Sequence, residues 1–341
     1  MKRILIFLIV SVPILLTSRS CIDTIDFRGK EMESKIVMYS LLQPDSTIKA
    51  FLSFSRTLFG NTSPQQQITN AVVKLYRDGE FIETLTYVPP SVQTWYPEPT
   101  PFSEYVSAGE TKPLPGSVYR IVAEIPGFKT AAGSASLPGI VPIEGIDTVS
   151  YTRDEFYMYL GIKTRFTDPA GKDNFYMISG YQKTGYYSGN PYQPWNPEIP
   201  VRVFEYEMDI NADDEPLIYP FMNDDIFNIY PYNYFNVFSD EMIPGKGYEL
   251  NLKTDYRKVD TTYYEFFHPT VILQSISEDL YLYLLSFSKY LDSYDDFFSE
   301  PVLVYTNVEN GLGVVGAINS SKMTVEIGKY PVDGILYSYG D

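Results

Sequence analysis

The sequence predicts a mainly β protein, with an N-terminal immunoglobulin-like β-sandwich followed by a larger β-rich domain that contains one α-helix. Three observations predict this class. Alternating apolar and polar runs recur at a spacing of roughly ten residues, with turn residues between them. The 25 prolines and 22 glycines are spread along the chain, which favours many turns over long helices. The 31 tyrosines favour strands and half-wet surfaces.

Composition divides the 341 residues into four expected segments. These are a signal peptide at 1–20, a polar tether at 21–34, the sandwich at 35–139 and the β-rich C-terminal domain at 140–341. The length of the third segment suits an immunoglobulin-like module, although the cysteine pair and core tryptophan of antibody domains are absent.

Each strand of the sandwich is expected from a short apolar run between turn residues. Residues 47–55 alternate clearly between an apolar and a mixed face, and Asp78-Gly79 is a hairpin signal. Residues 89–115, rich in proline and aromatic residues, are expected to form an exposed excursion. The expected strands are 35–42, 47–55, 71–76, 81–88, 117–124 and 128–136.

The C-terminal region shows similar runs with longer gaps. We expect a connector at 140–147, a turn at 167–171, a long loop at 182–200 and no clear period over 211–247. Strands are expected within 149–166 and at 174–181, 201–210, 248–256, 261–267, 301–305, 322–328 and 334–339.

One helix is expected near 278–292. Ser275 and Glu278 form a capping-box pattern, and apolar residues follow at near-helical spacing. Further on, three glycines lie in the region 307–316 without the lysine and helix of a phosphate loop, and this favours a strand turn with positive φ: Gly311, Gly313 and Gly316.

The N-terminus has the layout of a secretory signal peptide. Lys2 and Arg3 precede an apolar run, Ile4 to Leu16, which is shorter than the roughly 20 apolar residues of a membrane span. Thr17 to Ser20 follow and are mostly small, and then comes Cys21, the single cysteine of the chain. We therefore expect export and lipid attachment at Cys21, with ordinary cleavage beside an unmodified cysteine as the alternative.

The net charge argues against anionic partners. The formal charge of −17 becomes −20 once the three cations of residues 1–20 are removed. A body of this charge repels nucleic acid and anionic headgroups, so we expect membrane attachment through acyl chains alone. Because there is no second cysteine, no disulfide forms within one chain, and the fold depends on its core.

Five segments in order along the mature chain carry a family resemblance. They are KIVMYSLLQPDSTIKAFLSFSRTLFG after the export signal, FTDPAGKDNFYMI at 166–178, FMNDDIFN at 221–228, SISEDLYLYLLSFSKYL at 275–291 and EPVLVYTNVENGLGVVGAINSSK at 300–322. Together they resemble the DUF4249 family of Bacteroidetes lipoproteins. The resemblance implies an exported lipoprotein, encoded often beside SusC-like TonB-dependent outer-membrane receptors. It implies no catalytic residue, because the family has no established enzymatic activity.

No residue pattern predicts catalysis or a cofactor. His268 is the one histidine, so a zinc site or a nucleophile–histidine pair lacks the residues it normally needs. We expect His268 to be a packing or surface residue. Acidic residues cluster at 213–215, at 223–225 and around Asp292, Asp295 and Asp296, without the spacing of a calcium loop. Asp224 and Asp225 are weak calcium candidates, and solvated acidic loops are the alternative.

Aromatic residues in the expected loops are a second candidate site. Their rings suit stacking on a sugar or covering an apolar peptide, and packing of the loops onto the sheets is the alternative. The residues are Trp95, Tyr96, Tyr186, Tyr187, Tyr192, Trp195, Tyr230, Tyr232 and Tyr234.

Three functions from different classes remain open. The leading hypothesis is a non-enzymatic lipoprotein of the outer membrane, on the cell surface or the periplasmic face, accessory to or capturing an unknown ligand for a TonB-dependent receptor. The second is a structural or adhesive surface protein. The third is a hydrolase that acts through two close carboxylates, which a single sequence cannot place.

Overall fold

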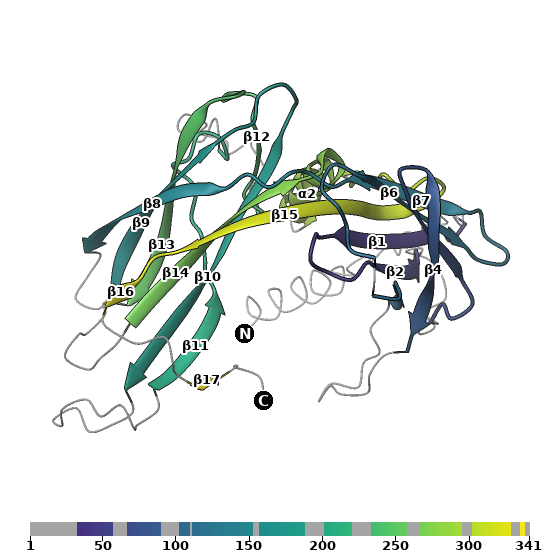
Figure 1. Cartoon of the computed structure of the whole chain (residues 1–341), viewed down its shortest axis with the longest axis horizontal. Helices are drawn as coiled ribbons and strands as arrows, with labels where there is room; N and C mark the ends of the chain where they lie inside the picture. The colour runs from purple at the N-terminus through teal and green to yellow at the C-terminus, as the bar shows by residue number, and fades with distance from the viewer. Residues whose placement is uncertain are drawn as a thin grey trace, which may run out of the picture. The chain divides into compact units, whose positions relative to one another are not determined.

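The computed structural model describes residues 33–56, 67–89, 102–109, 111–152, 157–187, 201–219, 233–257, 266–294, 302–328 and 335–337. Over these residues the protein is mainly β, with the helix α2 (Glu278–Tyr294) among the strands (Figure 1). The predicted class, mainly β with a helix that begins at Glu278, is confirmed.

The strands follow one another in two hydrogen-bonded sets. Fourteen strands form one sheet, whose path is β17-β11-β10-β14-β15-β1-β2-β5-β4-β3-β6-β7, with β12 beside β10 and β16 beside β14. The other three form a sheet in the order β13-β9-β8. Their bounds are β1 (Ile36–Leu42), β2 (Lys49–Phe54), β3 (Val72–Arg77), β4 (Glu80–Val88), β5 (Ser103–Val106), β6 (Val118–Glu124), β7 (Ala131–Ser136), β8 (Ile143–Thr152), β9 (Tyr157–Thr167), β10 (Phe175–Tyr187), β11 (Val201–Glu207), β12 (Val237–Ser239), β13 (Gly247–Arg257), β14 (Phe266–Ile276), β15 (Leu312–Thr324), β16 (Ile327–Gly328) and β17 (Ile335–Tyr337).

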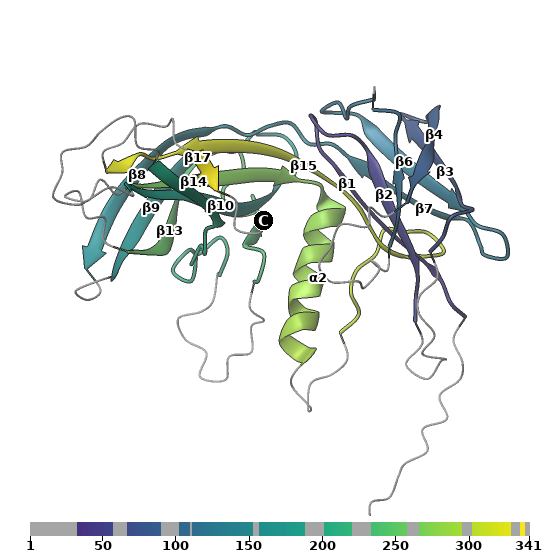
Figure 2. The same ribbon diagram turned by 90° about the horizontal axis from the view of Figure 1, so that it is seen from below.

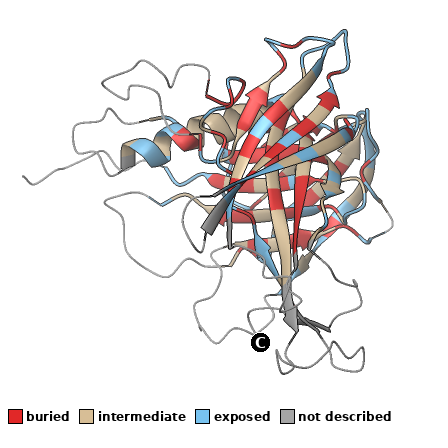
Figure 3. Cartoon of the chain, turned by 90° about the vertical axis from the view of Figure 1, so that its left-hand side faces the viewer, coloured by how far each residue is buried: buried red, intermediate tan, exposed pale blue. Residues whose placement is uncertain are grey.

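The N-terminal strands form two layers around one hydrophobic core. Apolar side chains from β1, β2 and β5 meet those from β3, β6 and β7, and the two layers are joined through β4, which pairs with both β5 and β3. Strands β1 and β6 place alternate residues in this core, as expected for a sheet with one solvent-exposed face. Figure 3, which looks onto the strands of the C-terminal part, shows buried positions interspersed with intermediate and exposed ones.

Strand β5 corrects the expectation of an exposed excursion at 89–115. Tyr105 is only 1% exposed, and its hydroxyl donates to the carbonyl of Ile68 at 2.7 Å and accepts from the N–H of Ala71 at 3.1 Å. The segment is short, and its pairing with β2 and β4 is distant in sequence. Because proline-rich segments flank this short strand, the sequence pattern did not predict it.

Strand β15 belongs to two cores. Its first half, Leu312–Ala317, pairs in parallel with β1, and its second half pairs antiparallel with β14. Val315 and Ala317 accordingly pack in the sandwich core. Gly313 has φ of 100°, and a Cβ there would lie 2.2 Å from the carbonyl oxygen of Met38 on β1. The expected positive φ is thus confirmed at Gly313 but was wrong at Gly311 and Gly316, and the expected turn region at 307–316 already contains the start of β15.

A second core lies between the three-stranded sheet and the strands β10 and β14. It contains apolar residues of β9 and β13 together with Tyr176, Ile178, Val271 and Leu273. Strand β8 begins at Ile143, inside the expected connector, so that expectation was wrong. Residues 302–308 contain no strand, in contrast to the expected strand at 301–305.

Helix α2 follows directly on β14 (Figure 2). It packs through Leu280 against Val314 and Ile318 of β15. The expected capping box was wrong, because Ser275 lies in β14 and pairs with Asn319. The residue before the helix is Ser277, whose carbonyl accepts the N–H of Tyr281 at 3.0 Å. Among the residues that the structure describes, no helix combines the length and hydropathy needed to span a bilayer.

Candidate functional site

A row of three side chains crosses the outward face of the three-stranded sheet. Tyr151 of β8 lies opposite Tyr159 of β9, which lies opposite Asp255 of β13. Directly opposed residues point to the same face of a sheet. This face is exposed to solvent, since Tyr151 is 53% exposed and Tyr159 is 36% exposed, while the neighbouring Leu160 is fully buried.

In the next row of this face, the residue on the central strand has no side chain. Gly161 of β9 lies between Val149 of β8 and Lys253 of β13. A Cβ on Gly161 would lie 3.0 Å from Cε2 of Tyr151, so the ring of Tyr151 lies over this glycine. The glycine therefore gives the tyrosine ring room to lie flat along the sheet.

The segment 208–213 lies along the outer edge of β13. Its residues alternate between buried and outward positions, with Met208, Ile210 and Ala212 in the second core. The backbones of Asn211 and Lys253 exchange two hydrogen bonds, each of 2.8 Å. This extended conformation directs the intervening polar side chains away from the core.

Glu215 anchors the end of this segment. Its side chain is completely buried, and its two carboxylate oxygens accept hydrogen bonds from the Tyr248 hydroxyl at 2.8 Å and the Asn251 N–H at 2.7 Å. Burial, and then the hydrogen bond to Glu215, raise the pKa of the Tyr248 hydroxyl. Glu215 therefore differs from the solvated acidic loop expected for residues 213–215.

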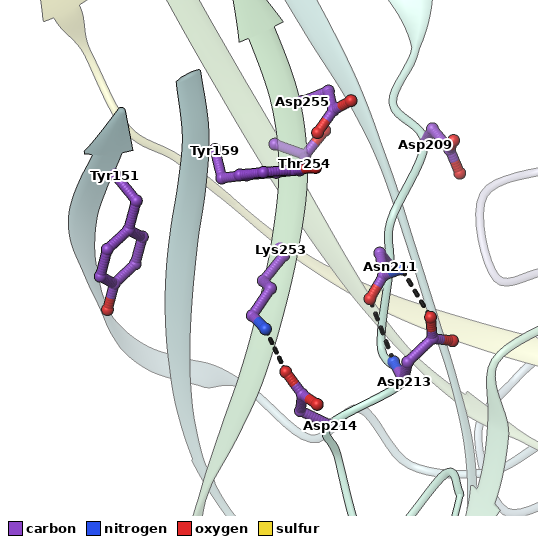
Figure 4. A pocket seen from close by; sticks show the side chains of 9 residues that line it. All are labelled: Tyr151, Tyr159, Asp209, Asn211, Asp213, Asp214, Lys253, Thr254 and Asp255. Carbon is purple, nitrogen blue, oxygen red and sulfur yellow. Dashed lines mark hydrogen bonds and ion pairs between the residues drawn. The ribbon is translucent and has the colours of Figure 1, made fainter. Parts of the chain in front are cut away.

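These elements enclose a pocket of about 850 Å³ (Figure 4). Lys253 forms an ion pair with Asp214. The amide of Asn211 donates to Asp213 Oδ2 at 2.8 Å, and its oxygen accepts the N–H of Asp213 at 3.2 Å. The lining residues are Tyr151, Tyr159, Asp209, Asn211, Asp213, Asp214, Lys253, Thr254 and Asp255.

The lining of this pocket offers groups that can contact a ligand. It offers two aromatic rings, several acceptor oxygens and one ammonium group. In the part of the chain that the structure describes, no three His, Cys, Asp or Glu side chains gather closely enough to hold a metal ion. The pocket volume lies within the range of small-ligand sites, about 300–1,000 Å³.

Two other carboxylates lie close together beneath the turn between β9 and β10. Asp168 and Asp240 are both buried, and the Nδ2 group of Asn174 donates to Asp168 Oδ1 at 3.1 Å and Asp240 Oδ2 at 3.2 Å. Asp168 also accepts from the N–H of Gly245 at 2.7 Å and from the hydroxyl of Tyr176. Burial raises the pKa of Asp240. These carboxylates tie the turn to residues 240–245 and are not among the residues that line the pocket.

His268 lies in β14 opposite Lys183 of β10 and is 8% exposed. Desolvation lowers the pKa of its imidazole, Glu326 opposes this shift, and Lys183 reinforces it. His268 is not among the residues that line the pocket.

Most of the other predicted site residues lie outside the described residues. Cys21 and the calcium candidates Asp224 and Asp225 are among them, as are Asp295 and Asp296. Of the aromatic candidates, Tyr234 is 47% exposed, and Tyr186 and Tyr187 belong to the end of β10. The remainder lie outside the described ranges: Trp95, Tyr96, Tyr192, Trp195, Tyr230 and Tyr232. Asp292 is exposed on α2.

Sequence reasoning named Asp213 and Asp214 but missed the other side chains of the pocket. The two tyrosines come from separate strands, and their meeting depends on a register between β8 and β9 that no local pattern reveals. One signal was present: the polar residues Asp209 and Asn211 alternate with apolar residues.

Comparison with known proteins gives a family and little beyond it. The family described as "Domain of unknown function (DUF4249)" matches residues 22–324. No curated protein sequence matches the chain. Among solved structures, bovine butyrophilin is 7% identical, with a TM-score of 0.18, over 71% of this chain and 92% of that chain.

Proposed function

This chain belongs to the DUF4249 family, and we propose that it is a non-enzymatic binding protein held at the outer membrane by a lipid on Cys21. In this proposal it captures a ligand for, or otherwise assists, a SusC-like TonB-dependent receptor. Two features support it, namely the export signal that ends at a single cysteine and the pocket on the three-stranded sheet.

The position of Cys21 is the observation that carries the proposal. It is the single cysteine in 341 residues, and it directly follows an apolar run and a short stretch, Thr17 to Ser20, of mostly small residues. Each acyl methylene contributes about 0.8 kcal/mol on burial in a bilayer. Two or three acyl chains are therefore enough to hold a strongly acidic body at a membrane that its charge would otherwise avoid.

The capture role is supported by the way the pocket is built. Its tyrosines project from paired strands, and its acidic segment is fixed to β13 by the backbone of Asn211 and the carboxylate of Glu215. Side chains on paired strands change little on binding, so a ligand pays little ordering entropy in the site.

Co-purification from native membranes tests the proposal. Membranes are solubilised in a mild nonionic detergent, and the full chain is captured through a C-terminal tag. We expect a receptor-type barrel protein to be recovered with it, as identified by mass spectrometry. The control is Cys21→Ser, which should leave the membrane fraction and lose the partner. Recovery of the wild-type chain without any receptor-type partner contradicts the receptor role.

A further inference from the structure

The pocket has an excess of negative charge. Four aspartates and one lysine line it, which leaves three formal negative charges: Asp209, Asp213, Asp214 and Asp255 against Lys253. The lysine is already paired with Asp214. Such a partly enclosed site concentrates cations, because charges within it interact more strongly than charges in bulk water.

The two tyrosines add a preference for organic cations. Tyr151 and Tyr159 are adjacent on neighbouring strands and present ring surface to the same pocket as the carboxylates. An aromatic face attracts an ammonium or guanidinium group and also covers the apolar stem that carries it. A bare metal ion uses only oxygen ligands of such a site.

One of the pocket carboxylates, Asp213, is held in place by the neighbouring Asn211. Oδ1 of Asp213 is buried, and none of the described residues donates a hydrogen bond to it. Its other oxygen, Oδ2, is already occupied by the amide of Asn211 at 2.8 Å. The residue as a whole is part-exposed, so its carboxylate adds negative charge to the pocket wall, while the buried Oδ1 is screened from the pocket.

We infer that this pocket binds an organic cation, specifically the ammonium or guanidinium groups of a short basic peptide. The inference rests on the proposed function only in taking the pocket as the site of ligand capture. The charge excess, to which Asp213 contributes, provides the attraction, and the tyrosines cover the side-chain stems. A pocket of about 850 Å³ has room for more than one side chain.

Isothermal titration calorimetry tests the ligand class. The probes are tetralysine, tetraglutamate and maltose, added to the full mature chain in nonionic detergent. Tetralysine is expected to bind with one-to-one stoichiometry and to weaken as salt is raised, because exposed charges are screened. Binding of maltose or tetraglutamate in place of tetralysine overturns the inference.

The direction in which a single substitution changes tetralysine affinity separates pocket binding from general attraction to an acidic protein. Lys253→Gln removes the one cation of the pocket and should tighten tetralysine binding by about threefold to tenfold. The matched control is Lys163→Gln, since Lys163 is also paired and similarly exposed, with side-chain exposures of 47% and 44% for Lys163 and Lys253. Equal effects of the two variants, or weaker binding by Lys253→Gln, overturn the inference.

Two further pairs of variants complete the test. Asp213→Asn and Tyr151→Thr should each weaken tetralysine binding by about threefold or more. Asp292→Asn on α2 and Tyr206→Thr on β11 are their controls outside the pocket and should leave affinity unchanged. If tetralysine fails to bind while the chain still co-purifies with a receptor, the ligand class is wrong and the proposed function stands.

Discussion

The hydroxyl of Tyr248 donates a hydrogen bond of 2.8 Å to the buried carboxylate of Glu215. This contact fixes the end of the acidic segment 208–215 to strand β13, beside which the pocket lies. The same carboxylate accepts N–H groups from Asn251 at 2.7 Å and from Leu217 at 3.2 Å. Three donors thus converge on one side chain that has no donor of its own when ionised.

Glu215→Gln should destabilise the fold. The amide keeps one acceptor oxygen but places an NH₂ group against a donor, so at least one buried hydrogen bond is lost. We expect a loss of about 2–3 kcal/mol in the free energy of unfolding, measured by urea denaturation. The control is Glu249→Gln on the same strand, where the exposed pair with Lys163 contributes less than about 1 kcal/mol. Equal losses in the two variants would contradict the anchoring role of Glu215.

Gly313→Ala should be among the more damaging small substitutions in the chain. The new methyl group would meet the carbonyl of Met38 at 2.2 Å, and the backbone has φ of 100°. We expect a loss of about 3 kcal/mol or more, or failure to fold, by urea denaturation. Gly139→Ala is the control, because a Cβ at Gly139 meets no atom within 4 Å. A wild-type unfolding midpoint for Gly313→Ala would show that β1 and β15 do not pair as described.

Titration of His268 should change the stability of the fold with pH in a defined direction. Desolvation lowers its pKa below the ordinary value of 6.5, so the unfolded chain binds the proton more tightly than the folded chain. The stability that this group contributes is present above about pH 6.5 and is lost as the pH falls through the folded pKa. Because the chain contains one histidine, NMR titration of an untagged, histidine-labelled preparation reports this group alone. A measured pKa at or above 6.5 would show that the imidazole is not buried as described.

The sequence predicted the elements that depend on residues close together in the chain. Asp78 and Gly79 adopt φ of 51° and 86°, as the Asp-Gly hairpin signal between β3 and β4 requires. The helix was expected from its apolar spacing and begins at Glu278. In contrast, β5 has four residues, and its pairing with β2 joins positions 51 to 57 residues apart in sequence.

The pocket was also harder to predict, because it depends on contacts between residues that are far apart in the sequence. Asp213 and Glu215 are two residues apart and look alike in sequence, yet one lines the pocket and the other is completely buried. What distinguishes them is the position of Tyr248 and Asn251 more than 30 residues later in the chain. Burial of a carboxylate depends on such distant donors, which no short motif encodes.

The mass of the native N-terminal peptide, released from purified membranes by proteolysis, is the most direct test of the envelope role. The proposal predicts a peptide that begins at Cys21 and carries the added mass of a diacylglyceryl group, with or without a further acyl chain. A peptide that retains residues 1–20, or one that begins at an unmodified Cys21, would contradict it.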